Sequence, residues 1–227
     1  MSHSLSTLAV ATSMLLVAAC ADSPSSVSSV SSVPSVIDPG DGGSYSPSLD
    51  PADFVDVIDI TVTGERKTVL GISAFVIRDT VTIGGALVED TYDWFAQDSA
   101  GNVWYLGEDV KDYADGKVVS TAGSWEAGVN GALPGIVMPA VPATGDVCRQ
   151  EFLSGEAEDM MEIIKVGASL AVRAGSFDDV VQTRDWTPLD PDTIEERAYA
   201  RGVGKIREAK TAGGNGFAEL VEFTLGD

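Results

Sequence analysis

Histidine is the first thing this sequence lacks: the only one is His3, near the amino terminus. A chain without an imidazole beyond that point cannot run Ser-His-Asp or Cys-His catalysis, and it cannot build a histidine-based metal site. Cysteine is nearly as scarce, because Cys20 and Cys148 are the only two. A multi-thiolate zinc site is therefore excluded.

Basic residues are also few. The 227 residues include 14 Lys and Arg against 35 Asp and Glu, which gives a net charge of −21 and a pI near 4.1. Such a surface repels phosphate backbones and anionic headgroups, so nucleic acid is not an expected partner. A charge of this size commonly serves solubility and does not by itself mark a site.

Long apolar runs are absent after Cys20, and the one before it, residues 7–19 (TLAVATSMLLVAA), is too short to span a bilayer as a helix. It has the length of a signal peptide, although residues 1–6 carry no Lys or Arg, unlike ordinary signal peptides. The run ends in Leu-Val-Ala-Ala-Cys, which resembles the bacterial lipobox. That resemblance implies lipid attachment to Cys20, cleavage after Ala19, and a place in the cell envelope. The lipid would hold the protein on the outer face of the cytoplasmic membrane or in the outer membrane.

Residues 21–50 are dominated by Ser, Pro and Gly and sustain no apolar period. A segment of this composition cannot bury enough apolar surface to fold, which indicates a disordered tether over residues 20–50. Residues 51–227 are long enough for one domain with a sizeable core. With residues 1–19 as signal peptide, the sequence predicts three parts.

The pattern of the domain is mainly β. Alternating or β-branched runs predict short strands, with a hairpin loop at residues 98–102 and a turn at residues 78–79. Residues 126–145 are rich in Gly and Pro and read as a loop without a helix or a central strand. Residues 156–166 could be helix or strand, and we favour strand. These signals predict an antiparallel, strongly curved sheet, a half-barrel or open barrel, with little helix. The predicted strands cover residues 54–62, 69–77, 80–88, 91–97, 103–106, 118–125, 147–152, 170–173, 180–186, 194–200, 204–208 and 216–225.

Aromatic residues concentrate in residues 91–125. Cross-strand aromatic pairs stabilise a sheet by about 0.2–1 kcal/mol each, so packing alone could explain them. The functional alternative is a ligand cavity with an aromatic rim, closed by the Gly/Pro-rich loop. The candidate ligand-binding residues are Tyr92, Trp94, Trp104, Tyr105, Trp125 and Met138.

Carboxylates form a second group: Glu151, Glu156, Glu158, Asp159 and Glu162. Paired carboxyl groups can catalyse glycoside hydrolysis or bind Ca²⁺, but no calcium-loop spacing is present, and solvated faces explain most acidic runs in so acidic a chain. Arg149 and Glu151 share one strand face and suggest an ion pair. Alternation around Cys148 favours a small buried strand residue over a reactive thiol.

Several longer motifs resemble a family of bacterial envelope lipoproteins without an assigned activity. They are residues 89–98 (EDTYDWFAQD), 101–108 (GNVWYLGE), 123–128 (GSWEAG), 134–140 (PGIVMPA), 149–152 (RQEF), 155–160 (GEAEDM), 185–189 (DWTPL) and 199–204 (YARGVG). The resemblance covers residues 50–220 and implies kinship, not a reaction. The last two motifs are also similar to lipoproteins whose curved sheet holds a lipid or another apolar ligand, a likeness of fold only.

Two hypotheses follow. The first is a non-enzymatic, lipid-anchored envelope protein that binds an apolar or amphipathic ligand, or an envelope partner, and needs neither cofactor nor metal. The second is a carboxylate-dependent hydrolase using residues such as Glu126 and Glu151, which requires two buried carboxyl groups within about 10 Å in one pocket. A calcium-binding envelope protein is a further alternative.

Overall fold

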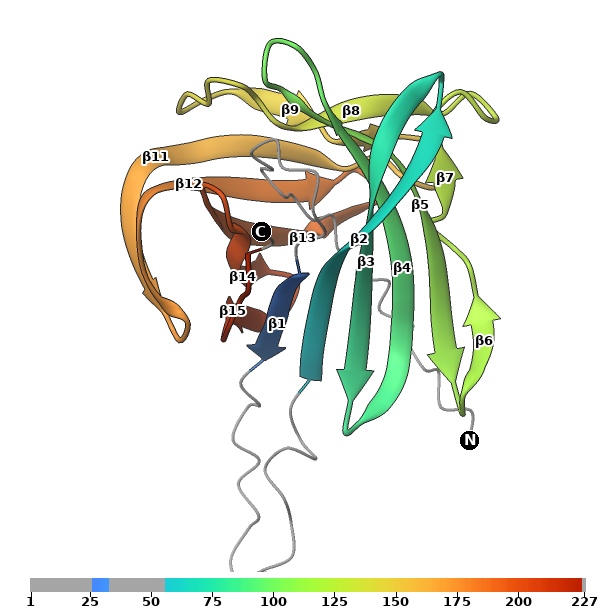
Figure 1. Ribbon diagram of the computed structural model, residues 1–227, viewed down its shortest axis with the longest axis horizontal. Helices are drawn as coiled ribbons and strands as arrows, with labels where there is room; N and C mark the ends of the chain where they lie inside the picture. Colours follow the sequence, from blue (N-terminus) through green and yellow to red (C-terminus); the bar gives the residue numbers. More distant parts are fainter. Residues whose placement is uncertain (1–25, 33–55, 226–227) are drawn as a thin grey trace, which may run out of the picture.

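A computed structural model of the chain describes residues 26–32 and 56–225, and every regular element in these ranges is a β-strand (Figure 1). The prediction of a mainly β, antiparallel fold is confirmed. The fifteen strands are β1 (Ser26–Ser32), β2 (Asp56–Val69), β3 (Ile72–Ile83), β4 (Ala86–Gln97), β5 (Val103–Ala114), β6 (Lys117–Ser120), β7 (Trp125–Glu126), β8 (Leu133–Met138), β9 (Val147–Arg149), β10 (Glu151–Phe152), β11 (Met160–Val172), β12 (Gly175–Thr187), β13 (Asp190–Ala200), β14 (Gly204–Ala212) and β15 (Phe217–Leu220).

The strands pair in the order β10-β8-β5-β4-β3-β2-β1-β15-β14-β13-β12-β11-β9, with β6 and β7 beside β5. The long strands β2–β5 form one wall, β11–β15 form the opposite side, and β8 and β9 cross above them in Figure 1. The sheet does not close into a barrel, because its terminal strands β9 and β10 do not pair with each other. They are instead consecutive in the chain, joined by Gln150 alone.

Register shifts accompany the bending of the long strands. The β11–β12 ladder shifts three times between Ile163 and Leu170, and the same two strands bend sharply in Figure 1. A bulge places an extra residue on one strand and increases its local twist. Bulges of this kind let long strands wrap around a common interior, which agrees with the open form among the predicted shapes.

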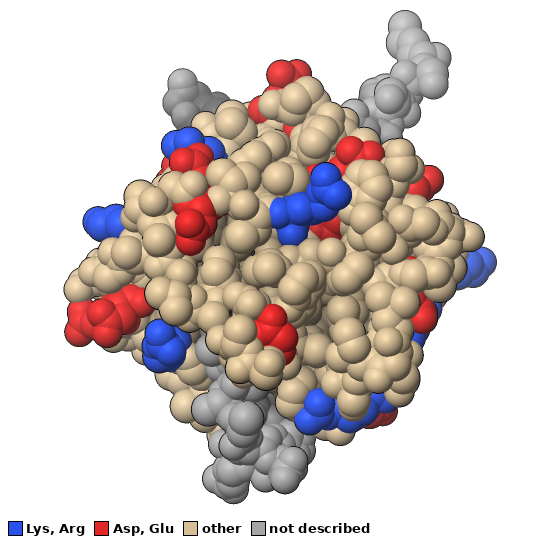
Figure 2. Space-filling model, turned by 90° about the horizontal axis from the view of Figure 1, so that it is seen from above, with Lys and Arg blue, Asp and Glu red and all other residues tan. Residues whose placement is uncertain are grey.

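Charged groups account for an unusual share of the interior. Apolar residues from both walls form the core, among them Ile60, Ile77, Leu106, Ile206 and Leu220. Between them lie buried polar and charged side chains: Asp79, Asp90, Thr91, Asp93, Glu108, Gln150, Glu151, Thr183, Asp185, Arg197 and Lys205. The acidic composition therefore does not serve the surface alone. In Figure 2 the face on the β8–β9 side is largely uncharged, and its acidic residues are scattered rather than gathered.

The turn predicted at residues 78–79 is wrong, because both lie inside β3. The turns fall at Leu70–Gly71 and Gly84–Gly85, where all four residues have positive φ, the geometry that matches the twist of a tight hairpin. Asp79 is a buried acid inside a strand, only 1% exposed. It does not mark a reversal of the chain.

The predicted loop at residues 126–145 is also wrong in part, since it contains β8. Pro134 lacks an N–H, yet β8 pairs with β5 on one side and with β10 on the other. Gly135 explains the close fit: a Cβ there would overlap the backbone of Arg149 and Gln150. The glycine thus marks a close approach of two chain segments rather than a loop.

The segment predicted as a tether differs over Ser26–Ser32, which forms β1 between β2 and β15. The rest of that segment, the predicted signal peptide and Cys20 lie outside the described residues. In the ranges that the structure describes, no helix has the length and apolar character needed to cross a membrane.

Candidate functional site

A bulge on β5 shapes the centre of the β4–β5 hairpin. Asp93 lies opposite Glu108 and Phe95 lies opposite Tyr105, so β5 has one more residue than β4 between these pairs. Gly107 occupies the extra space with φ of 138°. A Cβ at this position would meet the Trp125 backbone oxygen and lie 2.9 Å from the Trp94 ring. The glycine therefore lets the Trp94 indole lie directly against the strand.

A pocket of about 320 Å³ opens beside this bulge. It combines two tryptophans, one cation, three carboxylic side chains and several small polar or apolar groups. The lining residues are Lys67, Trp94, Glu108, Asp109, Ser124, Trp125, Glu126, Val129, Asn130 and Leu153. A concave site with an apolar wall and a few converging polar groups is the common form of a small-molecule site. We call it the tryptophan pocket.

Lys67 covers one side of this pocket. Its Nζ lies 3.3 Å from the centroid of the Trp94 ring and 2.8 Å from Glu126 Oε2. The Lys67 and Glu126 side chains are each 34% exposed, so solvent screens the ion pair and its effect on stability is small. Both remain accessible to a ligand, and together they offer a donor and an acceptor at the pocket wall.

Buried carboxyl groups lie behind the pocket. The Tyr105 hydroxyl donates a 2.5 Å hydrogen bond to Asp93 Oδ1, and Trp125 Nε1 donates a 2.7 Å hydrogen bond to Glu151 Oε2. Glu108 lies opposite Asp93 and interacts electrostatically with both acids, and we call Asp93, Glu108 and Glu151 the acid cluster. Each is at most 6% exposed.

Burial raises the pKa of every member of the acid cluster. Loss of solvation, only partly offset by the Tyr105 hydrogen bond, raises the pKa of Asp93 to about 7. Burial and then the nearby Asp159 raise the pKa of Glu151 to about 8. The pKa of Glu108 is raised well above its ordinary value by burial, then by Glu151 and Asp93. Burial and mutual repulsion both favour the protonated form of neighbouring carboxyl groups.

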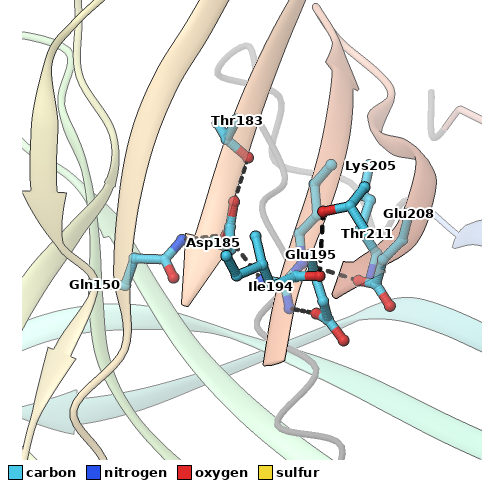
Figure 3. Close-up of polar contacts among 9 residues, drawn as sticks. Gln150, Thr183, Asp185, Ile194, Glu195, Lys205, Glu208 and Thr211 are labelled. Carbon is cyan, nitrogen blue, oxygen red and sulfur yellow. Dashed lines mark hydrogen bonds and ion pairs between the residues drawn. The ribbon is translucent and has the colours of Figure 1, made fainter. Parts of the chain in front are cut away.

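A second buried cluster lies on the opposite wall, around Arg197; Figure 3 labels its other members Asp185, Glu195, Lys205 and Glu208. The guanidinium binds Asp185 at 3.1 Å through Nη1, Glu195 at 2.7 Å through Nη2 and Glu208 at 2.9 Å through Nε. Lys205 Nζ lies 2.7 Å from the same Glu208. Two cations thus face three carboxylates in the arginine cluster, and good pairing geometry is what makes such burial tolerable.

Gln150 links the two clusters. It is the single residue between β9 and β10, and its Nε2 donates a 3.1 Å hydrogen bond to Asp185 in the arginine cluster (Figure 3). Its chain neighbour Glu151 belongs to the acid cluster. The position at which the chain passes from one end of the sheet to the other therefore also connects the polar interiors of the two walls.

Only some of the six predicted ligand-binding residues line the tryptophan pocket. Trp94 and Trp125 line the tryptophan pocket, and Tyr105 lies behind it in an edge-to-face contact with Trp125 at 5.2 Å. The other three, Tyr92, Trp104 and Met138, are not among its lining residues: Tyr92 lies near Arg78 and Lys111, Trp104 donates to Asp98 Oδ2 at 2.9 Å, and Met138 packs in the core.

The predicted carboxylate group also separates. Glu151 and Asp159 turn inward, whereas Glu158 accepts a hydrogen bond from the Gly155 N–H and Glu162 pairs with Arg184. Over the residues that the structure covers, no three His, Cys, Asp or Glu are arranged to hold a metal ion. The expected pair of Arg149 with Glu151 does not form, because Arg149 lies over the Phe152 ring at 4.6 Å.

Sequence reasoning missed Lys67 and Arg197, and it did not predict that the acids Asp93 and Glu108, which lie among the aromatic residues, are buried. A signal was nevertheless present for the acids: in a strand, Asp93 shares a face with the apolar Phe95, which marks an acid that points into the core. No comparable signal marks Lys67, because it reaches Trp94 from a strand that is two positions away in the sheet.

A second pocket, of about 330 Å³, lies near the β2–β3 turn and the β4–β5 loop. Arg66 lines it and covers the Phe75 ring at 3.3 Å from the centroid, much as the neighbouring Lys67 covers Trp94. The remaining lining residues are Ile72, Ser73, Phe95, Ala96, Gln97, Asp98, Ser99 and Val103. We call it the phenylalanine pocket.

Comparison with protein-family models gives no match, and no curated protein matches the chain. Among solved structures, the chain is similar to the crystal structure of a protein from Parabacteroides distasonis that is provisionally described as a lipoprotein. The two share 13% sequence identity with a TM-score of 0.40, and the match covers 88% of this chain and 95% of the other.

Proposed function

We propose that this protein is a lipid-anchored cell-envelope protein that binds a small amphipathic ligand in the tryptophan pocket. One observation carries the binding proposal: Trp94 and Trp125 line the same cavity as the Lys67–Glu126 ion pair and the buried carboxyl group of Glu108. Apolar ring surface beside a few directed polar groups suits a ligand with one apolar face and several polar groups.

The anchor rests on the sequence around Cys20. Two or three acyl chains hold a protein stably at a membrane, and residues 21–225 contain no apolar run of spanning length. Metabolic labelling with a clickable fatty acid tests the anchor: wild type should be labelled and Cys20→Ser should not. Equal labelling of both would refute the lipobox assignment.

Adjacent residues offer a matched test of the binding site. Lys67 and Arg66 each place a cation 3.3 Å from the centroid of an aromatic ring, but they line different pockets. Ligand-observed NMR with a panel of neutral methyl glycosides, glucuronate and decanoate should detect binding to wild type and to Arg66→Ala. Binding should weaken about tenfold or more in Lys67→Ala. If only Arg66→Ala loses binding, the phenylalanine pocket is the site instead.

Glycoside hydrolysis is the second candidate. The pocket does not contain the two buried carboxyl groups that the hypothesis called for, but it does combine two acids in different environments, buried Glu108 and half-exposed Glu126. A glycosidase needs one carboxylic acid that retains its proton and one carboxylate. Glu108 would then replace Glu151 as one of the two carboxylic residues, because the Glu151 carboxyl group accepts the hydrogen bond from the Trp125 indole. Turnover of nitrophenyl glycosides by wild type, lost in Glu126→Gln, would favour this candidate over simple binding.

A further inference from the structure

Glu108 occupies a distinctive place in the tryptophan pocket. It lies on β5 opposite Asp93 of β4 and opposite Trp125 of β7. It lines the cavity and is nevertheless only 6% exposed. A polar group that is this deeply buried and still borders a cavity can interact with whatever enters that cavity.

Carboxyl groups approach Glu108 from several elements. Burial raises its pKa most, followed by Glu151 on β10, Asp93 on β4 and Asp159 before β11. Lys67, the cation that lines the pocket, pairs with Glu126, and Lys111 nearby on β5 pairs with Asp109. A charge on Glu108 would thus lie in a poorly solvated, acidic surrounding, which favours the neutral carboxylic acid.

A neutral carboxylic acid differs from a carboxylate in one respect that a ligand can sense: it carries an O–H donor. We propose that Glu108 is the specificity-determining residue of the tryptophan pocket and donates a hydrogen bond to an uncharged ligand rich in hydroxyl groups, of the pyranose class. The inference deepens the proposed binding function and rests on it.

The rest of the pocket suits such a ligand. The Lys67–Glu126 pair presents a donor and an acceptor to hydroxyl groups, and Asn130 adds an amide. Trp94 and Trp125 provide apolar surface for the C–H face of a sugar ring. An anionic ligand would instead meet Asp109, Glu126 and the acid cluster behind them, in a protein of net charge −21.

The first test needs no ligand. In protein labelled with ¹³C at the glutamate carboxyl carbons, the resonance lost in Glu108→Gln identifies Glu108. We expect it to retain the shift of a neutral acid at pH 7. An ordinary titration near pH 4 would overturn the inference, even if the pocket binds a ligand.

The second test measures binding of methyl β-D-glucopyranoside, with glucuronate and decanoate as anionic probes, by ligand-observed NMR between pH 5.5 and 8.5. Wild type should bind the neutral glycoside wherever the carboxyl titration shows Glu108 neutral, and at least tenfold more weakly wherever it shows Glu108 ionised, while circular dichroism shows that it stays folded. Glu108→Gln, whose amide is a permanent donor, should bind without pH dependence. Preference for an anion, or binding by wild type that does not change once the carboxyl titration shows Glu108 ionised, overturns the inference. If no probe binds, the proposed function fails with it, whereas the carboxyl titration still reports the state of Glu108.

Discussion

The indole Nε1 of Trp125 donates a 2.7 Å hydrogen bond to Oε2 of Glu151, 26 positions later in the chain. Both side chains are buried, at 4% and 2% exposure. This bond connects β7, which lies beside β5, with β10 at the end of the sheet. It also gives an oxygen of Glu151 a partner in a place from which water is nearly excluded.

Trp125→Phe should therefore destabilise the protein by about 2 kcal/mol. The substitution retains a large aromatic ring but removes the N–H, which leaves a buried carboxyl oxygen without its donor. Urea unfolding followed by circular dichroism measures the change in the free energy of unfolding.

Trp104→Phe is the matched control. Trp104 Nε1 donates to Asp98 Oδ2 at 2.9 Å, but Asp98 also accepts from the Asn102 side chain and from the backbone N–H groups of Ala100 and Asn102. Because this carboxylate keeps three donors and borders solvent, we expect the free energy of unfolding to fall by less than about 1 kcal/mol. Equal losses of stability in the two variants would show that the Trp125–Glu151 hydrogen bond contributes no more than the Trp104–Asp98 hydrogen bond.

Arg197→Met should be far more damaging, by about 3–5 kcal/mol, because it leaves Asp185, Glu195 and Glu208 without the cation that all three contact. Arg184→Met is the comparison: its 3.4 Å pair with Glu162 joins side chains that are 46% and 35% exposed, so its loss should stay within about 0.5 kcal/mol. Thermal and urea unfolding of both variants tests this. A mild effect at Arg197 would mean that its three partners hold protons in its absence.

The β-strands could be predicted from the sequence because buried and exposed side chains alternate along a strand, and apolar and polar residues alternate with them. The hairpin loop at residues 98–102 formed as expected, with Gly101 at φ of 99°. Local patterns failed where a distant segment decides the outcome. In the sequence Asp79 looks like a turn residue, but in the fold Lys205 of β14 interacts with it. Residues 134–135 look like a loop, but in the fold they lie in a strand between β5 and β10.

The candidate site was predictable only in part for the same reason. Trp94 and Trp125 stand out as aromatic residues in a strand-rich region, but nothing local tells which aromatics share a cavity. Glu126 and Glu151 looked equivalent in the sequence, whereas the fold leaves Glu126 half-exposed at the pocket wall and buries Glu151 behind it. Burial, which sets the protonation of each acid, depends on long-range pairing and cannot be inferred from neighbours in the chain.

Gly107→Ala should disrupt the pocket and destabilise the fold by about 2 kcal/mol or more. The residue needs positive φ, and its new Cβ would overlap backbone atoms of Trp125 and Glu126, which cannot yield as a flexible side chain would. Gly175→Ala separates the two causes, since it has a similar φ of 145° with nothing within 4 Å of the added Cβ. We expect it to lose only about 1 kcal/mol. Denaturant unfolding of the two variants gives the part of the destabilisation that comes from the overlap. Similar losses of stability in both would contradict a role for the overlap.

The raised pKa values of the buried acids predict that stability falls as pH rises. The pKa values of Glu151, Asp93 and Asp159 are raised by burial to about 8, 7 and 6, from ordinary values of 4.5, 3.8 and 3.8. Between about pH 4 and pH 8 the folded protein therefore binds more protons than the unfolded chain. Each such proton lowers the free energy of unfolding by about 1.4 kcal/mol per pH unit. Unfolding in urea at pH 5.5 and pH 8 should show the lower midpoint at pH 8.

Glu151→Gln is the variant that tests the cause. A neutral amide in place of the carboxyl removes one of the titrating groups, so the decline between pH 5.5 and pH 8 should become shallower. Glu208 acts at the other end of the scale: burial opposes its ionisation, but Lys205 and then Arg197 lower its pKa to about 2. Its stabilising effect is complete above pH 4.5 and disappears only as the pH falls toward 2, outside the measured window. A wild-type midpoint that rises between pH 5.5 and pH 8 would mean that the buried acids are ionised in the folded protein.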